Sequence, residues 1–261
     1  MLLHYNTFTS EKSGNQWITF VHGAGGNSSI WSHQIRFFQE YFNLLLIDLR
    51  GHGKSIDSNQ TNKEDRYTFD SVSKDIMDVL DHINIKQSHF VGISLGSILI
   101  RKLAENYPDR MSKMVLAGAI LDLNLQSRFL MLMGKLTQSI LPFIWIYTVL
   151  AYVVMPYKNH RKSRSIFIRE AKKLSHNEFV RWYKLTANIR PLLKGFRNVE
   201  VKIPTLYIMG SEDYLFLPFV KEIIKIQKNA TLLILSKCGH VVNVEKPQQF
   251  NAGLLQYLRL D

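Results

Sequence analysis

The stretch F-V-G-I-S-L-G-S, residues 90–97, places a serine between two glycines at the end of an apolar run. The residues before Ser94 predict a buried strand, and I-L-I-R-K-L-A-E after it predicts a helix. A serine on a sharp turn from strand to helix is typical of a nucleophile elbow, but serine is also a common helix cap. The turn alone therefore leaves both interpretations open.

Outward from this turn, short apolar and β-branched runs alternate with segments of helical spacing. The predicted strands lie at 17–21, 44–47, 89–93, 114–119, 205–209 and 231–235. Helical spacing is seen in Phe69, Val72, Ile76, Val79, Leu80 and Ile83, and in Phe250, Leu254 and Leu258. The predicted fold class is α/β, a mostly parallel sheet with helices on both faces, whose ligand binds at the carboxyl ends of the strands.

The alternation stops between the strands at 114–119 and 205–209, where the chain is mostly helical. Residues 121–200 hold 14 Lys and Arg against 4 Asp and Glu, whereas residues 1–120 hold 12 of each and residues 201–261 hold 7 against 5. We therefore expect a core of residues 1–121 and 201–261, and a helical, basic and apolar cap of residues 122–200 over the binding crevice.

Composition excludes several classes of protein. With 261 residues, 46% of them hydrophobic and 21% charged, the chain has the composition of a soluble globular protein. One cysteine, Cys238, cannot form an internal disulfide framework or by itself hold a structural zinc ion. The first ten residues lack the apolar run of a secretory signal, so we expect a cytoplasmic protein.

A serine nucleophile needs a histidine base and an acid, which follow an elbow serine in the order acid, then histidine. Asp213 and His240 follow the predicted strands at 205–209 and 231–235, at the same sheet edge as Ser94. Glu212 and Asp122 remain alternative acids. Solvated loops are the alternative interpretation of these residues.

The segment V-H-G-A-G-G-N, residues 21–27, follows the strand at 17–21. It matches neither a phosphate-binding loop nor the dinucleotide fingerprint. It suits the second half of an oxyanion hole, in which the N–H of Ala24, or alternatively that of Gly25, joins the N–H of Leu95.

With these motifs in place, the chain resembles the α/β-hydrolase superfamily, particularly serine esterases such as monoacylglycerol lipases and carboxylesterases. The resemblance rests on H-G-A-G-G at 22–26, D-L-R-G-H-G-K-S at 48–55, G-I-S-L-G at 92–96, G-S-E-D at 210–213 and G-H at 239–240. Ile93 and Ser97 depart from residues common in the family. The resemblance implies a nucleophilic Ser94, a cap inserted after the sixth strand of the family fold, and no metal or cofactor.

The run at 136–155 has twenty uncharged residues, the length of a transmembrane helix. Ser94 precedes this run while Asp213 and His240 follow it, and the three must meet on one side of any membrane. Pro142 would also break the helix. We therefore favour a pair of buried cap helices that line an apolar pocket.

A basic cluster follows this run, consisting of Lys158, Arg161, Lys162, Arg164, Arg169, Lys172 and Lys173. Basic residues beside an apolar stretch are typical of proteins that bind anionic membrane surfaces, although a solvated helix face is the alternative. No nucleic acid partner is expected, because the aromatic residues do not interleave with the charges.

The leading hypothesis is a serine carboxylester hydrolase for an apolar, lipid-like acyl ester. In it Ser94 attacks, His240 transfers the proton and Asp213 orients His240. Alternatives are a thioesterase or a carbon–carbon bond hydrolase with the same triad, and a non-catalytic ligand-binding protein that keeps the fold.

Overall fold

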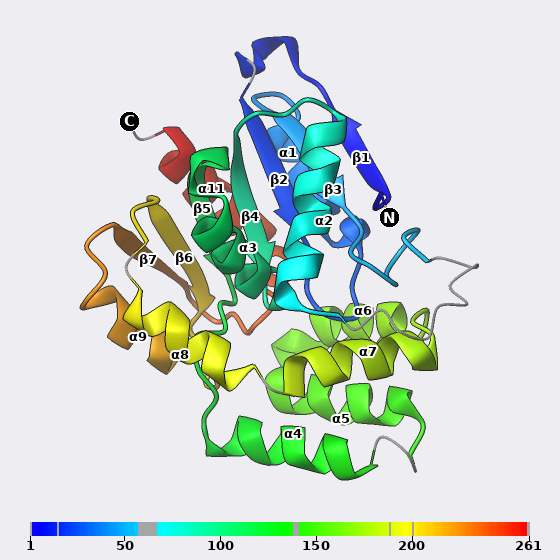
Figure 1. Cartoon of the computed structure of the whole chain (residues 1–261). Helices are drawn as coiled ribbons and strands as arrows, with labels where there is room; N and C mark the ends of the chain where they lie inside the picture. Colours follow the sequence, from blue (N-terminus) through cyan, green and yellow to red (C-terminus); the bar gives the residue numbers. More distant parts are fainter. Residues whose placement is uncertain are drawn as a thin grey trace.

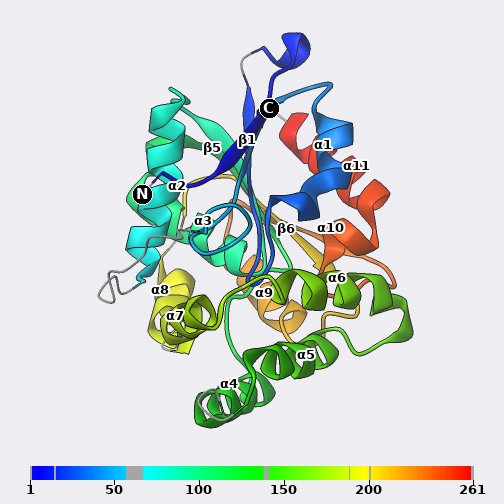
Figure 2. The ribbon, with the colours of Figure 1, turned by 90° about the vertical axis from the view of Figure 1, so that its right-hand side faces the viewer.

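A seven-stranded sheet, with strand order β1-β3-β2-β4-β5-β6-β7, forms the centre of the computed structural model (Figures 1 and 2). The structure describes residues 2–14, 16–56, 67–137, 141–187, 189–199 and 201–259. Neighbouring strands are parallel except for β1 and β3, which are antiparallel. The predicted α/β class is confirmed.

All six predicted strands are present, and a seventh was missed. The strands are β1 Tyr5–Phe8, β2 Trp17–Val21, β3 Asn43–Ile47, β4 Ser88–Ile93, β5 Met111–Ala117, β6 Thr205–Gly210 and β7 Ala230–Leu235. Strand β1 is short and only partly buried at the sheet edge, so its sequence lacks the apolar run that marks the inner strands. Strand β5 ends at Ala117, two residues before the predicted end.

Helices cover both faces of the sheet because successive strand residues point to opposite sides. On one side, Phe90 packs in the same cluster as residues of α2 (Phe69–His82), α3 (Leu95–Asn106) and α9 (Leu217–Ile224). On the other side, Val91 packs with residues of α1 (Ser32–Phe38) and α11 (Pro247–Arg259), which follows the short α10 (Val242–Glu245). Figure 2 shows these two layers on either side of the strands.

Among the described residues, five α-helices between β5 and β6 form what we call the helical insertion. They are α4 Leu125–Thr137, α5 Phe143–Val154, α6 Arg161–Ala171, α7 His176–Ala187 and α8 Arg190–Asn198. In Figure 1 they lie below the arrowheads of the parallel strands, with α4 farthest from the sheet. This is the sheet edge at which ligands bind in open α/β folds.

The uncharged run at 136–155 is not one continuous helix. Helix α4 ends at Thr137 and α5 begins at Phe143, after Pro142, while residues 138–140 lie outside the described residues. In the described part of the chain, no helix is both long and apolar enough to cross a membrane. The expectation that both helices are buried is wrong on their outer side, where Leu136 and Trp145 are exposed.

Candidate active site

Ser94 occupies the sharp turn between β4 and α3. Its backbone has φ 54° and ψ −117°, a combination that residues other than glycine rarely adopt. A Cβ on Gly92 would lie 2.6 Å from the backbone of Gly96, and one on Gly96 would lie 2.3 Å from the carbonyl oxygen of Val21. The spacing Gly-x-Ser-x-Gly thus reflects the close approach of β4, α3 and β2, which holds Ser94 in its strained conformation.

The structure brings Ser94, His240 and Asp213 together in one chain of hydrogen bonds. The Oγ atom of Ser94 lies 2.9 Å from Nε2 of His240, and Nδ1 of His240 lies 2.8 Å from Oδ2 of Asp213. Asp213 is 1% exposed and His240 is 5% exposed. The backbone N–H of Phe216 donates to the other carboxylate oxygen of Asp213, which fixes the acid in place.

The two alternative acids have other partners. Glu212 accepts hydrogen bonds from Asn159 and from Nε2 of His160, on the side of the helical insertion. The bond from Asn159, with that from His160, holds the pKa of Glu212 below its ordinary value. Asp122 forms an ion pair with Arg197 at 2.6 Å. Asp213 is therefore the acid that contacts His240.

The expected oxyanion donors, Ala24 and Leu95, both line the pocket that contains Ser94. Leu95 is the first residue of α3, where backbone N–H groups lack partners within the helix. The backbone N–H of Gly25 already donates a hydrogen bond to Nε2 of His52, at 3.0 Å. Within the described residues, the N–H of Ala24 donates to no other group. The geometry thus favours Ala24 over Gly25.

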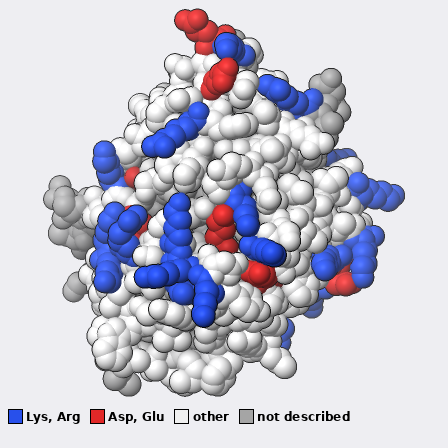
Figure 3. All heavy atoms as spheres, turned by 180° about the vertical axis from the view of Figure 1, so that it is seen from behind, with Lys and Arg blue, Asp and Glu red and all other residues white. Residues whose placement is uncertain are grey.

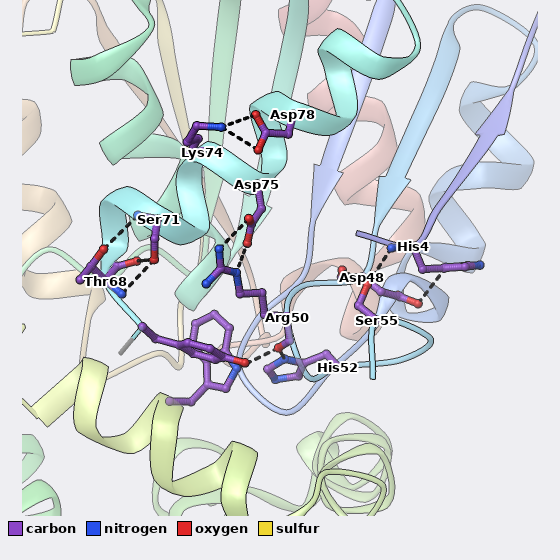
Figure 4. A network of polar contacts seen from close by, with 12 residues as sticks. His4, Asp48, Arg50, His52, Ser55, Thr68, Ser71, Lys74, Asp75 and Asp78 are labelled. Carbon is purple, nitrogen blue, oxygen red and sulfur yellow. Dashed lines mark hydrogen bonds and ion pairs between the residues drawn. The ribbon is translucent and has the colours of Figure 1, made fainter. Parts of the chain in front are cut away.

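The D-L-R-G-H-G-K-S loop at residues 48–55 contacts the segment 21–27, which carries the expected oxyanion donor Ala24. Nδ1 of His52 donates to the carbonyl of Arg50 at 2.9 Å, which leaves Nε2 free to accept from Gly25. Burial, together with the neighbouring His22, lowers the pKa of His52 to about 3, so the ring is neutral. Figure 4 shows this loop, with Arg50 paired to Asp75.

Asp48 anchors the other end of this loop. Although burial alone would raise the pKa of Asp48, hydrogen bonds from the N–H groups of Lys54 and Ser28 hold it below the ordinary value. Nδ1 of His4 lies 3.2 Å from the same carboxylate, and Figure 4 shows His4 beside Asp48. These contacts fix the beginning of the 48–55 loop.

Contacts from α6 and the turn before it hold the two loops that carry Asp213 and His240, and the sequence did not indicate these contacts. His160 is fully buried and donates to Glu212, the residue next to Asp213, at 2.8 Å. Ser163 donates to Glu245, whose other oxygen accepts the N–H of Gly239, next to His240. These partners lie far apart in the sequence, and no local pattern marks them.

A cavity of about 590 Å³ opens beside Ser94 and His240, between the sheet and the helical insertion. Its lining is mostly apolar and includes Ile98, Met131, Ile146, Phe167, Leu215 and Val244. Its charged lining residues are Lys162, Arg169 and Glu170, all on α6. Across the described ranges, no three His, Cys, Asp or Glu side chains gather as a metal site requires.

Comparison with known proteins agrees with this architecture. A family model for the alpha/beta hydrolase fold matches residues 16–139, from just before β2 to just beyond α4. The structure of MenH from S. aureus shares the fold with a TM-score of 0.81, covering 98% of both chains at 19% identity. The chain is therefore similar in sequence to α/β hydrolases over these residues and shares their fold.

Two curated proteins match this chain over nearly its whole length. The 3-oxoadipate enol-lactonase 2 of Acinetobacter baylyi is 27% identical and is matched over 95% of this chain and 90% of its own. The 2-hydroxy-6-oxononadienedioate/2-hydroxy-6-oxononatrienedioate hydrolase of Burkholderia vietnamiensis is 26% identical, over 98% and 91%. These relatives support an enzyme with hydrolase activity.

Proposed function

We propose that this protein is a serine hydrolase of the α/β-hydrolase superfamily that cleaves carboxylic esters of apolar acyl groups, with the helical insertion as its cap. The observation that carries the proposal is the hydrogen-bonded chain from Ser94 through His240 to Asp213, facing a mostly apolar cavity. A binding protein would not need a serine held in a strained turn against a buried histidine and acid.

In the proposed reaction, Ser94 Oγ attacks the ester carbonyl carbon while Nε2 of His240 takes the hydroxyl proton. Asp213 accepts the Nδ1–H bond, keeps the productive tautomer and stabilises the imidazolium that forms. The carbonyl oxygen becomes an oxyanion, which the N–H groups of Ala24 and Leu95 would stabilise.

The tetrahedral intermediate then collapses as the bond to the alcohol oxygen breaks, and His240 gives its proton to that oxygen. The alcohol leaves, and the acyl group remains esterified to Ser94. His240 next removes a proton from water, which attacks the acyl carbon and releases the carboxylic acid, restoring the Ser94 hydroxyl. No further reactant is required.

The apolar lining of the pocket favours a substrate with an uncharged acyl group. It is less suited to the substrates after which the two relatives are named. Both of those names specify derivatives of dicarboxylic acids. A carboxylate buried in an apolar pocket would need a cation. The basic residues in the described lining are Lys162 and Arg169, both exposed, and Arg169 is paired with Glu170 at 3.0 Å.

The Burkholderia vietnamiensis relative favours a second candidate, hydrolysis of a carbon–carbon bond with the same triad, and a thioesterase would use the same acyl-enzyme chemistry. The first test is a panel of 4-nitrophenyl esters from acetyl to decanoyl, acyl-CoA thioesters and a 2-hydroxy-6-oxodienoate. We expect kcat/KM to be highest for medium or long esters. Preference for the dienoate, or for the thioesters, would replace the ester proposal.

A further inference from the structure

The outer face of α4 and α5 is apolar and exposed to solvent. On α4 the exposed residues recur at helical spacing, as they do on α5. The set, called here the apolar face, consists of Leu125, Phe129, Leu132, Leu136, Trp145, Val149 and Tyr152, each between 53% and 81% exposed. Exposed apolar surface gathered in this way, unlike scattered single residues, marks an interaction site.

The apolar face is continuous with the mouth of the cavity beside Ser94. Several residues of α4, α5 and their connection are exposed and also line that cavity. These are Met133, Leu141, Trp145, Val149 and Leu150. The cavity therefore opens onto the apolar face, so a molecule held against this face lies at the pocket entrance.

Basic side chains flank the apolar face where α5 ends. Lys158, Arg161 and Lys162 are exposed, and Lys162 also lines the cavity. The guanidinium of Arg164 lies 4.4 Å from the ring centre of Tyr152, which joins the basic cluster to the apolar face. In Figure 3, the lowest part of the molecule is nearly free of charge, and Lys and Arg gather directly above it.

The acidic side chains of the insertion offset only a small part of this charge. Asp122, Glu170 and Glu178 each form an ion pair with an arginine of the insertion. Residues 121–200 hold 14 Lys and Arg against 4 Asp and Glu. The surface around the apolar face is consequently strongly basic.

We propose that the apolar face enters the surface of an anionic lipid membrane, with the basic cluster at the lipid headgroups and the pocket mouth facing the lipid. Exposed Trp and Tyr side chains suit the boundary between acyl chains and headgroups, and amphipathic helices bind there without crossing the membrane. That the lipid layer also supplies the acyl ester rests on the proposed function. The binding itself does not.

Charge favours a lipid surface over a second copy of the chain. Two copies joined through this face would bring two basic insertions together, and like charges in close contact oppose association. Anionic headgroups complement the same charge, and each Lys or Arg near such a surface strengthens binding about fivefold.

The test is sedimentation with vesicles, using Ser94→Ala protein so that no turnover occurs. One set of vesicles is phosphatidylcholine, and the other contains one third phosphatidylserine. We expect binding to the anionic set, weakened by high salt. The triple change Lys158→Gln, Arg161→Gln and Lys162→Gln should weaken it about a hundredfold. Arg164 is left intact because it donates to the carbonyls of Met155 and Tyr157.

The apolar face is tested by a double change to polar residues, Phe129→Asn and Trp145→Asn. This variant should bind anionic vesicles about tenfold more weakly. Ile226→Asn is the matched apolar control, because Ile226 is equally exposed outside the insertion. Lys86→Gln, Lys221→Gln and Lys228→Gln together are the matched charge control, being exposed lysines of the core. Both control proteins should bind as the parent does, and circular dichroism should show that every variant is folded.

Fluorescence gives a second measurement, because Trp145 is 62% exposed while Trp31 and Trp182 are buried and Trp17 is partly buried in β2, outside the insertion. Emission should shift to shorter wavelength with anionic vesicles, and this shift should vanish in Trp145→Phe. Absence of vesicle binding, equal binding to both vesicle sets, or no effect of the two insertion variants overturns the proposal. The proposal is also overturned if the protein self-associates and the double change Phe129→Asn and Trp145→Asn abolishes that self-association. If binding holds but wild type hydrolyses no ester, the proposed function fails separately.

Discussion

The sheet core and the helical insertion differ in how firmly their side chains are held. Helix α3, which follows Ser94, is buried along most of its length, and the triad residues are fixed by hydrogen bonds of 2.8 and 2.9 Å. Helix α5 buries Tyr147 and Ala151 but exposes Trp145 and Val149. The core therefore holds Ser94, His240 and Asp213 in one arrangement, whereas α5 both lines the cavity and faces solvent.

The largest expected effect lies in the core, at the acid of the triad. Asp213→Asn should lower kcat for a 4-nitrophenyl ester by about 10⁴-fold, because an amide disfavours the productive tautomer of His240. Steady-state kinetics on purified protein provides the measurement.

Glu212→Gln and Asp122→Asn are the matched controls for this change. Each should keep kcat within about tenfold of wild type, since neither acid contacts His240. A larger loss in Asp122→Asn than in Asp213→Asn would assign the acid to the loop after β5.

A smaller effect should arise where the insertion contacts the core. His160→Ala removes the hydrogen bond to Glu212, next to the triad acid. We expect kcat to fall up to about a hundredfold with little change in KM, because misplacement of catalytic groups lowers the rate more than binding.

His160→Gln should restore most of that activity, because its amide can donate to Glu212 in place of Nε2. His176→Ala, at an exposed histidine of the same insertion, should change little. Equal losses in kcat for His160→Ala and His160→Gln would contradict a role for hydrogen-bond donation to Glu212.

The sequence predicted the core site better than the insertion, for physical reasons. Ser94, Asp213 and His240 each follow a buried strand, and parallel strands end at one sheet edge, so their meeting could be inferred. The bond between His160 and Glu212 depends on how α6 packs on the core. Periodicity within a helix carries no such information.

The same reason explains the error about α4 and α5. An uncharged run predicts burial, but it does not say which partner covers each side of a helix. Helix α5 lines the cavity through Ile146, while Tyr152 on the same helix is exposed and lies outside the described lining. Strand β1 escaped prediction because an edge strand needs no apolar run.

Changes in the pocket should alter selectivity more than chemistry. Ile146→Asn should lower kcat/KM for a decanoyl ester about tenfold or more, but for an acetyl ester less than about threefold, because only the long chain loses apolar contact. A chain-length series measures both, with Ile226→Asn as the control. Equal loss on both esters would mean that Ile146 only stabilises the insertion.

The smallest expected effect concerns acid stability of the core. The pKa of His52 is about 3 in the folded protein and near 6.5 when unfolded, so the unfolded state binds more protons between these values. The contribution of neutral His52 to the free energy of unfolding is therefore fully present above pH 6.5, and it decreases as the pH falls below that value. At pH 5, His52 should account for a loss of about 2 kcal/mol.

Urea unfolding at pH 7.5 and pH 5.0 measures this contribution. His52→Gln removes the titrating group, so its loss of stability between the two pH values should be smaller than that of wild type. An identical loss in both proteins would contradict a depressed pKa at His52.

The central claim is that the core activates Ser94, and covalent labelling by a fluorophosphonate tests it most directly. The reagent modifies an activated hydroxyl, so wild type should incorporate one label per chain, located at Ser94 by peptide mass spectrometry. Ser94→Ala should incorporate none, and Ser236→Ala, at an exposed serine beyond β7, should label as wild type does. Undiminished labelling of Ser94→Ala, or no labelling of folded wild type, would contradict the account.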